Sequence, residues 1–342
     1  MFLVYLFLFG LMSISTQSPL KVDSNYQHEF ESFIQKFERV YKDDAEKQLR
    51  FKVFVENLVE IAENAKSHPS AEFGITKFAD WTKEEKAKVM GIHAPKKLAP
   101  KPAQHVLQQK YNLPESFDWR QRNMVTPVKD QGSCGSCWTF QAVAVLESHI
   151  LLSGGKQTIL SEQEIVDCDH IWGVSGCEGG TSNSALTYVQ RLGLDTEKQY
   201  PYKGIDQTCH ARYNTSGRTF IKEWTLLNQD ENNAAYQLTQ LGPLGYNIWV
   251  PGSLFSYKSG VYYPSEAECL RAEEAGAGHA ITIVGFGTEN GIPYWLIKNS
   301  WGTGWGDQGY FKIHRGNLTC SINYVNPNVP DMNSGYFLAI TY

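Results

Sequence analysis

The sequence lacks a hydrophobic run long enough to cross a membrane. A spanning helix needs about 20 apolar residues, and the longest apolar run, from Phe2 to Met12, is shorter than that. This run stands at the N-terminus and is followed by the small residues Ser13 and Ser15, as in a signal peptide. We therefore expect residues 1–17 to be a signal peptide and the protein to have no membrane anchor. Because no positive charge precedes the run, a short buried N-terminal helix or strand stays open as an alternative.

The sequence also lacks an excess of basic residues. It has 31 Lys and Arg against 36 Asp and Glu, a formal net charge of -5, and its basic residues form no long cluster apart from Lys96, Lys97 and Lys101. A nucleic-acid binder usually carries a concentrated positive charge. We therefore expect no nucleic-acid partner. The chain has no internal repeat and no low-complexity tract that would indicate a solenoid or a disordered protein.

Cysteine is absent from the first 133 residues, and all seven cysteines lie between positions 134 and 320. In an exported protein such cysteines predict disulfide bonds, and an odd number leaves at least one cysteine without an internal partner. Six cysteines can pair in 15 ways, so spacing alone does not select the pairs. Two glycosylation sequons begin at Asn214 and Asn317, and we expect both to lie on the surface.

The cysteine-free N-terminal part predicts two helices. Apolar residues recur at helical spacing from Tyr26 to Tyr41. A second stripe mixes charged, amide and apolar residues at steps of three and four, which places them on one face of one helix. Such a mixed face favours packing through specific polar contacts over a simple core. The stripe consists of Glu46, Arg50, Phe54, Asn57, Ile61 and Asn64.

A proline- and lysine-rich stretch, residues 91–112, favours an extended and exposed linker. The chain beyond it divides into a half that favours helices, up to about Arg212, and a half that favours strands. In the second half, short apolar runs bounded by glycine, proline or asparagine predict strands. These runs are Ala280 to Phe286, Tyr294 to Ile297 and Tyr310 to Ile313.

Cys137 stands just before a strongly helical stretch, Phe140 to Leu152, and is therefore expected at or near a helix N-terminus. The partial positive charge and the unpaired amides at that position stabilise a thiolate and make the cysteine a better nucleophile. Two other interpretations remain open on this motif alone. Cys134 and Cys137 could form a Cys-x-x-Cys redox or metal pair, or both could be ordinary structural cysteines.

Three motifs in the same order resemble the papain family of cysteine peptidases. The segment Cys134 to Trp138 reads Cys-Gly-Ser-Cys-Trp and matches the signature around the nucleophile of that family. Downstream, His279 opens a predicted strand, and the segment Asn299 to Tyr310 is similar to the family's segment around an orienting asparagine. The resemblance implies that Cys137 is the nucleophile, that His279 is its acid/base partner, and that Asn299 orients the imidazole.

The resemblance implies further roles around this trio. The side-chain amide of Gln131 and the backbone N–H of Cys137 would stabilise the oxyanion, and Trp301 would cover the hydrogen bond between Asn299 and His279. It also implies that Cys134 pairs with Cys177, Cys168 with Cys209, and Cys269 with Cys320. No metal and no cofactor are implied.

The expected substrate-binding residues follow from the same motifs. Gly179 and Gly180 would face the substrate backbone, where missing side chains allow close approach. Thr181, Ser182 and Asn247 make the side-chain pocket more polar than is usual in the family, which favours a weaker preference for large aliphatic P2 residues. The full expected set is Gly179, Gly180, Thr181, Ser182, Asn247, Ala277, Gly278, Trp301 and Val325.

The N-terminal part resembles the inhibitory propeptide of the cathepsin L-like branch. The mixed stripe from Glu46 to Asn64 is similar to its helix motif, and Gly74 to Asp80 is similar to its second motif. The stripe departs from the family in the step from Ile61 to Asn64, which is three residues where the family has four. We expect residues 18–112 to be this propeptide and residues 113–342 to be the peptidase domain.

The expected fold is α+β: a papain-like arrangement of a helical left domain and a β-barrel-like right domain, preceded by a mostly helical propeptide. The expected activity is that of a cysteine endopeptidase made as a zymogen, because no insertion that would cap one end of the cleft is apparent. The expected partners are protein and peptide substrates and the chain's own propeptide, with a monomeric state and a lysosomal, vacuolar or extracellular location in the secretory pathway. The alternative is a catalytically weak binding or inhibitory protein with the same fold, which the intact catalytic positions disfavour.

Overall fold

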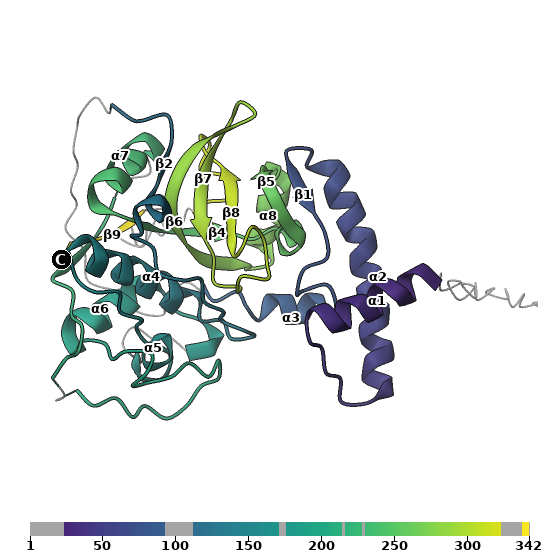
Figure 1. Ribbon diagram of the computed structural model, residues 1–342, viewed down its shortest axis with the longest axis horizontal. Coiled ribbons are helices and arrows are strands. Elements are labelled where there is room, and N and C mark those ends of the chain that lie inside the picture. The colour runs from purple at the N-terminus through teal and green to yellow at the C-terminus, as the bar shows by residue number, and fades with distance from the viewer. Residues whose placement is uncertain are drawn as a thin grey trace, which may run out of the picture.

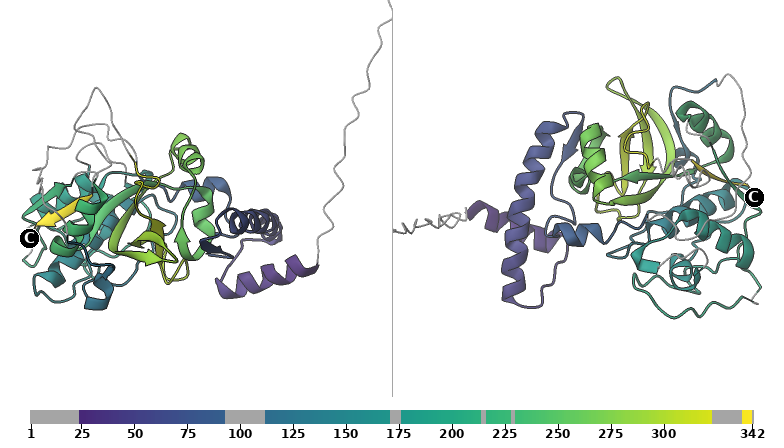
Figure 2. Two further views of the ribbon diagram at one scale, coloured as in Figure 1. Left: turned by 90° about the horizontal axis from the view of Figure 1, so that it is seen from above. Right: turned by 180° about the vertical axis from the view of Figure 1, so that it is seen from behind.

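A computed structural model describes residues 24–92, 112–170, 176–213, 216–227, 230–322 and 337–341. The expected signal peptide, most of the linker, the sequon residue Asn214 and the pocket residue Val325 lie outside the described residues. Figure 1 shows two parts, a body that contains the sheet and a smaller N-terminal part at one side of it. The views from above and from behind in Figure 2 keep this N-terminal part at one end of the molecule.

The N-terminal part consists of helices that cross each other and a short strand that extends the sheet of the body (Figure 1). Two helices were predicted there, and both form. Their contact is an aromatic cluster in which Phe30, Phe33 and Phe54 are fully or almost fully buried. The elements are α1 (Ser24–Lys36), α2 (Asp44–Ser67), β1 (Ala71–Phe73) and α3 (Lys83–Ala87).

The mixed stripe on α2 makes the specific polar contacts that its composition predicted. Arg50 Nη2 donates over 2.7 Å to Oε1 of Glu85, a residue of α3. Asn57 Nδ2 donates to the carbonyl oxygen of Ala79 over 2.8 Å. These contacts fold the segment after β1 back onto α2, so the stripe stabilises the N-terminal part from within.

The body begins with a helical half. Helix α4 passes through its centre, and nearly every side chain of this helix is buried, because neighbouring helices and the sheet surround it. Ser161 and Thr181 cap the next two helices, since each side chain accepts a hydrogen bond from a backbone N–H of the first turn. The elements of this half are β2 (Phe117–Asp118), η1 (Trp119–Arg122), α4 (Cys137–Leu152), α5 (Glu162–Cys168), η2 (Gly176–Glu178) and α6 (Ser182–Leu192).

The second half is a sheet with the strand order β1-β5-β8-β7-β6-β4-β9-β3, and β2 pairs with β6. Neighbouring strands are antiparallel except β5 and β8. The three predicted strands form as β6, β7 and β8. The elements are β3 (Glu223–Leu226), α7 (Glu231–Leu241), β4 (Leu244–Trp249), η3 (Gly252–Ser256), β5 (Tyr257–Tyr262), α8 (Glu266–Glu274), β6 (Gly278–Glu289), β7 (Ile292–Lys298), β8 (Tyr310–His314) and β9 (Leu338–Thr341).

The last described residues close this sheet, a role that the sequence alone did not indicate. Strand β9 pairs with β3 and contacts β4. Phe337, just before it, is fully buried and stacks on Tyr246 with ring centroids 5.0 Å apart. Residues 337–340 are therefore part of the core.

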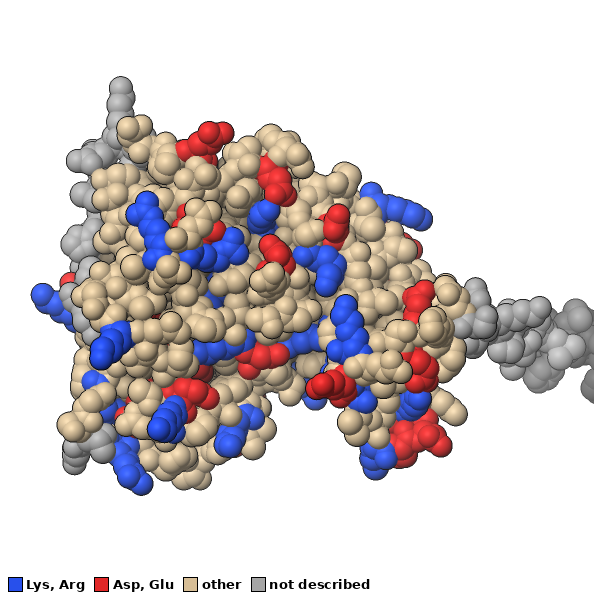
Figure 3. All heavy atoms as spheres, viewed as in Figure 1, with Lys and Arg blue, Asp and Glu red and all other residues tan. Residues whose placement is uncertain are grey.

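Two further features are the distribution of charge on the surface and the hydropathy of the helices. On the face shown in Figure 3, acidic and basic side chains are interspersed, with no broad area of one sign. Within the described ranges, no helix is both long and apolar enough to span a bilayer.

Candidate active site

Cys137 is the first residue of α4 and is completely buried. It is the free cysteine of the structure, because the other six form disulfide bonds. The bond from Cys134 to Cys177 excludes a Cys-x-x-Cys pair between Cys134 and Cys137. All three bonds join the cysteines that the family resemblance pairs: Cys134 with Cys177, Cys168 with Cys209, and Cys269 with Cys320.

His279 lies in β6, on the opposite side of the site from α4. Its Nε2 is 2.8 Å from Asn299 Oδ1. The same Oδ1 accepts the backbone N–H of Ser300 over 2.9 Å, which identifies it as the oxygen end of the amide. Nε2 therefore carries the proton and donates, and Nδ1 is left as the acceptor nitrogen. The buried Nδ1 has no hydrogen-bond partner among the described residues.

Trp301 covers this hydrogen bond. Its indole stacks on the imidazole of His279 with ring centroids 4.9 Å apart and planes 28° apart. His279 and Trp301 are fully buried, and Asn299 is 3% exposed. Water is therefore excluded from the bond that orients the imidazole.

Gln131 is held with its amide nitrogen toward the site. Ser300 Oγ donates to Gln131 Oε1 over 2.7 Å, which fixes the oxygen end of the amide. The nitrogen end donates to the carbonyl oxygens of Val89 and Cys134, each over 2.8 Å. A donor on the loop before α4 is thus aimed at a carbonyl of the N-terminal part, the kind of group that a substrate would present.

The segment after α3 passes through the site. The backbone N–H of Gly180 donates to the carbonyl oxygen of Gly91 over 2.8 Å, and the N–H of Ile92 donates to the carbonyl oxygen of Gly278 over 3.1 Å. Gly91 and Ile92 are therefore paired with one residue from each half of the body. The chain's own N-terminal part thus passes between the two halves of the body next to Cys137.

Burial under this segment opposes charge on both reactive groups. It raises the pKa of the Cys137 thiol to about 11, although the backbone N–H groups near the sulfur, that of Ala280 among them, act in the opposite direction. Burial also lowers the pKa of His279 to about 4, against the effect of its hydrogen bond to Asn299. In this state the pair is a neutral thiol and a neutral imidazole.

Some of the expected pocket residues have a structural role in the fold. A Cβ atom on Gly180 would lie 2.6 Å from the indole of Trp138, so this glycine makes room for packing in addition to pairing with Gly91. The hydroxyl of Thr181 caps α6 by accepting the N–H of Ser184. Ser182 is buried, and its hydroxyl has no hydrogen-bond partner in the described part of the chain.

The remaining pocket residues lie on the sheet side. Asn247 is half-buried, with its Oδ1 bound to Gln141 Nε2 over 3.0 Å, and Ala277 is half-buried before β6. Ile322, which no motif indicated, is fully buried. Its side chain and that of Ile92 both lie within 3.2 Å of the position that a Cβ atom on Gly278 would take. Motif comparison had no signal for Ile322, because it lies in a loop after the last cysteine.

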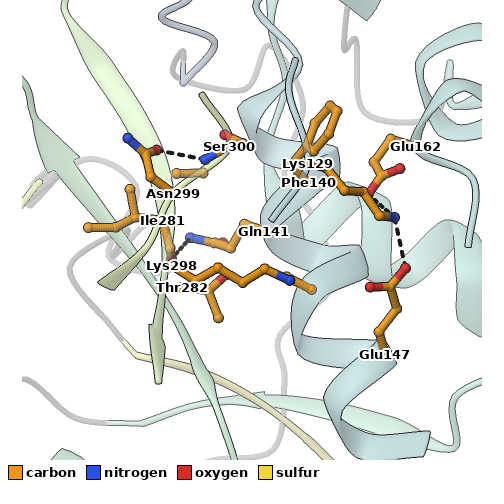
Figure 4. A pocket seen from close by; sticks show the side chains of 12 residues that line it. Lys129, Phe140, Gln141, Glu147, Glu162, Ile281, Thr282, Lys298, Asn299 and Ser300 are labelled. Atoms are coloured by element: carbon orange, nitrogen blue, oxygen red, sulfur yellow. Dashed lines mark hydrogen bonds and ion pairs between the residues drawn. The ribbon is translucent and has the colours of Figure 1, made fainter. Parts of the chain in front are cut away.

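A buried ionic cluster behind the site was also missed. Lys129 Nζ donates to Glu147 over 2.8 Å and to Glu162 over 2.7 Å, and Lys298 lines the same small pocket beside Asn299 (Figure 4). Burial lowers the pKa of Lys298 to about 8. The cluster joins both halves of the body, but its members are far apart in the sequence and belong to no local motif.

Known proteins share both parts of this arrangement. Residues 113–327 match the model of the papain family cysteine proteases, and residues 30–85 match the cathepsin propeptide inhibitor domain. Thiol protease aleurain of Arabidopsis thaliana is 38% identical over 306 residues, which cover 89% of this chain and 84% of the relative. Cathepsin L of Sarcophaga peregrina is 36% identical over 320 residues, which cover 89% and 92%.

A solved structure extends the likeness to three dimensions. The digestive procathepsin L2 proteinase from Tenebrio molitor larval midgut has a TM-score of 0.81 and 34% sequence identity, over 93% of this chain and the whole of that one. The likeness includes the N-terminal helices as well as the body. The chain therefore belongs to the papain family of cysteine proteases, as a zymogen whose inhibitory propeptide precedes the peptidase domain.

Proposed function

We propose that Cys137 is the nucleophile of this cysteine endopeptidase, that His279 is its acid/base partner, and that Asn299 orients the imidazole. The observation that carries the proposal is the environment of His279. Its Nε2 is bound to Asn299, whereas its buried Nδ1 has no partner among the described residues. The N–H of Ala280, the next residue, lies against the Cys137 sulfur, so the free nitrogen and the free thiol belong to one site.

The reaction follows from this arrangement once the propeptide has left. Cys137 transfers its proton to Nδ1 of His279, and the positive end of α4 stabilises the thiolate. The sulfur attacks the peptide carbonyl, and the Gln131 side chain with the Cys137 backbone N–H donates to the oxyanion. His279 then gives its proton to the leaving amine, which leaves a thioester on Cys137. In the second step His279 takes a proton from a water molecule, the water attacks the thioester carbonyl, and the thiolate of Cys137 leaves as the acid is released.

We propose that the propeptide blocks this reaction in two ways. It places its backbone between Gly180 and Gly278, where a substrate would pair. It also buries the thiol and the imidazole, which favours their neutral forms. Removal of the segment restores solvent to both groups, so the ion pair can form.

The boundaries proposed for the precursor are a signal peptide at 1–17, a propeptide at 18–112 and a peptidase domain at 113–342. The proposed signal peptide would direct the precursor into the secretory pathway. We propose that the enzyme acts as a monomer in a lysosome, in a vacuole or outside the cell. Asn317 is exposed, as a glycosylated residue must be. The three disulfide bonds fit an oxidising compartment.

The test is active-site titration with an irreversible thiol-directed epoxide after maturation in acid, followed by peptide mapping of the label. We expect stoichiometric label on Cys137 and complete loss of peptidase activity. Cys137→Ser should take up no label and have no activity. A correctly processed wild-type chain that takes up no label would instead support the catalytically weak binding or inhibitory protein.

A further inference from the structure

Gln141 ties the two halves of the peptidase domain together next to the proposed catalytic pair. It lies one helical turn after Cys137 on α4 and is 3% exposed. Its Nε2 donates to the carbonyl oxygens of Ile281 and Tyr246, each over 2.8 Å, and to Asn247 Oδ1 over 3.0 Å. Figure 4 shows its amide pointing from the helix toward the strand that carries Ile281.

The acceptors lie on the strands that build the opposite wall of the site. Ile281 is two residues after His279 on β6. Tyr246 lies on the neighbouring strand β4 and is the partner of Ile281 in the β4–β6 pairing. Asn247, the neighbour of Tyr246, is one of the expected pocket residues. One side chain from the nucleophile's helix thus contacts the histidine's strand and the pocket's strand at the same time.

The sheet leaves room for this side chain. A Cβ atom on Gly245 would lie 2.9 Å from the Cδ and Oε1 atoms of Gln141. Gly245 and Asn247 are two residues apart on β4 and therefore lie on the same face of the strand, the face toward α4. The absence of a side chain at Gly245 allows the amide to reach the strands.

An amide in this place requires an explanation beyond packing. Between a helix and a sheet an apolar side chain would fill the space without a desolvation cost, whereas a buried amide destabilises the fold unless its polar atoms are bound. The NH2 group of Gln141 has two hydrogens and three acceptors, so one hydrogen is shared between two acceptors. The acceptors lie in different directions and together fix the position of the amide. Directional bonds of this kind fix the register of two elements, which apolar contacts do not.

We propose that Gln141 is a positioning residue that sets the separation of Cys137 and His279 and the orientation of Asn247. The inference rests on the proposed function of the Cys137–His279 pair. By holding Ile281 to α4, Gln141 fixes the strand that carries the imidazole relative to the helix that carries the thiol. By holding Oδ1 of Asn247, it directs the NH2 end of that amide away from α4.

Two substitutions test the role of the donor. Gln141→Met keeps the length and removes the hydrogen bonds. Gln141→Glu can donate only while its carboxyl is protonated, because the ionised form would face two carbonyl oxygens and an amide oxygen. Gln163→Met is the control, since Gln163 is a fully buried glutamine whose Nε2 donates to Asp167 Oδ1 and to the carbonyl oxygen of Ile205, both within the helical half.

All rates are measured on matured enzyme and divided by the concentration of active sites, which is determined by titration with the epoxide. For Gln141→Met we expect kcat to fall by about tenfold or more with little change in KM, because a small loss of alignment is costly in a reaction of positioned groups. The rate of alkylation of Cys137 by iodoacetamide should fall at mildly acidic pH, where the thiolate depends on its ion pair. For Gln141→Glu we expect activity to decline as pH rises and the carboxyl ionises. Gln163→Met should lower thermal stability and leave both kcat and the alkylation rate of Cys137 unchanged.

The outcomes separate the two proposals. If Gln141→Met only lowers the melting temperature, and keeps the kcat and alkylation profile of wild type per titrated site, Gln141 is a structural residue and the inference is wrong. A P2 profile that shifts together with kcat supports the link to Asn247. If the wild-type enzyme itself takes up no label on Cys137, the proposed function fails before Gln141 is tested.

Discussion

A Cβ atom on Gly91 of the propeptide would lie 3.2 Å from the Sγ of Cys137 and 1.8 Å from the carbonyl oxygen of Gly135. The second distance is well inside any possible contact, so the propeptide can cross Cys137 only where it has no side chain. The backbone of Gly91 is also bound to Gly180. We therefore predict that inhibition by this segment depends on Gly91.

Gly91→Ala should weaken the block. Relief of the overlap requires the segment to lift from Cys137, and overpacking of this kind costs on the order of 1–3 kcal/mol, or about 5- to 150-fold in the open population. We expect the intact proenzyme with this change to react with the epoxide at least about fivefold faster at neutral pH.

Gly74→Ala is the matched control within the propeptide. The added Cβ would meet Lys258 at 3.4 Å, an ordinary contact, and its labelling rate should equal that of wild type. Equal rates for Gly91→Ala and wild type would show that the segment already lifts freely.

Arg50 links the two helices that present this segment. Its guanidinium binds Glu85 through both nitrogens and donates to the carbonyl oxygen of Asp80 over 3.0 Å. Arg50→Met should destabilise the propeptide fold by roughly 1–3 kcal/mol, because charged, two-point hydrogen bonds are lost at a partly buried position. We expect earlier unfolding of the N-terminal part by hydrogen exchange. Lys52→Met, on the exposed face of α2, should change stability by less than about 0.5 kcal/mol.

The local elements of this fold could be predicted from the sequence, and the relations between distant ones could not. The strand of His279 and the helix after Cys137 follow from short patterns of apolar residues. The stripe from Glu46 to Asn64 predicted polar contacts but not their partners, since Glu85 and Ala79 lie 35 and 22 residues further along the chain and the pattern does not specify what folds back onto it.

The candidate site divides in the same way. Residues inside recognisable motifs, such as Cys137 and His279, could be named in advance. Ile322, Gln141 and Lys129 could not, because each acts through contacts with chain segments that are remote in sequence. The polar character of Thr181 was also read as a pocket property, whereas its hydroxyl serves as a helix cap.

Acid should destabilise the covered state through His279. Its pKa is lowered from 6.5 to about 4 by burial, so between these values the unfolded chain binds a proton that the folded chain does not. Stability is therefore fully present above pH 6.5 and is lost as pH falls toward 4, by a contribution on the order of 3 kcal/mol. Denaturant unfolding of the Cys137→Ser proenzyme across this range measures the loss. The same proenzyme with His279→Gln should show a clearly smaller loss, and an identical slope would exclude His279 as its source.

The proposed pocket residues Asn247 and Ser182 lead to a prediction about substrate selection at P2. Burying a large aliphatic side chain against polar groups gains less than burying it against apolar ones. We expect a P2 library scan to show a weak preference for leucine and phenylalanine, and Asn247→Val to raise kcat/KM for P2 leucine several-fold. A strong leucine or phenylalanine optimum in the unmodified enzyme would contradict this prediction.

The buried cluster behind the site should be the most sensitive point of the peptidase domain. Lys129 neutralises Glu147 and Glu162, whose side chains are 0% and 2% exposed. Lys129→Met would remove the ion-pair partner of both buried carboxylates and leave Lys298, which donates to Thr126, as the nearby cation. Removing one partner of a buried ion pair costs about 3–5 kcal/mol. Burial already raises the pKa of Glu162, and without the opposing charge of Lys129 it should rise further.

A carboxyl with a raised folded-state pKa is tolerated in its protonated form and costs stability as pH rises through that pKa. The loss of melting temperature in Lys129→Met should therefore be greater at pH 8 than at pH 5. Lys156→Met, at an exposed position, should show almost no loss at either pH. If the deficit of Lys129→Met were the same at both values, the two carboxylates would have to be hydrated in the folded protein, and Lys129 would act by packing alone.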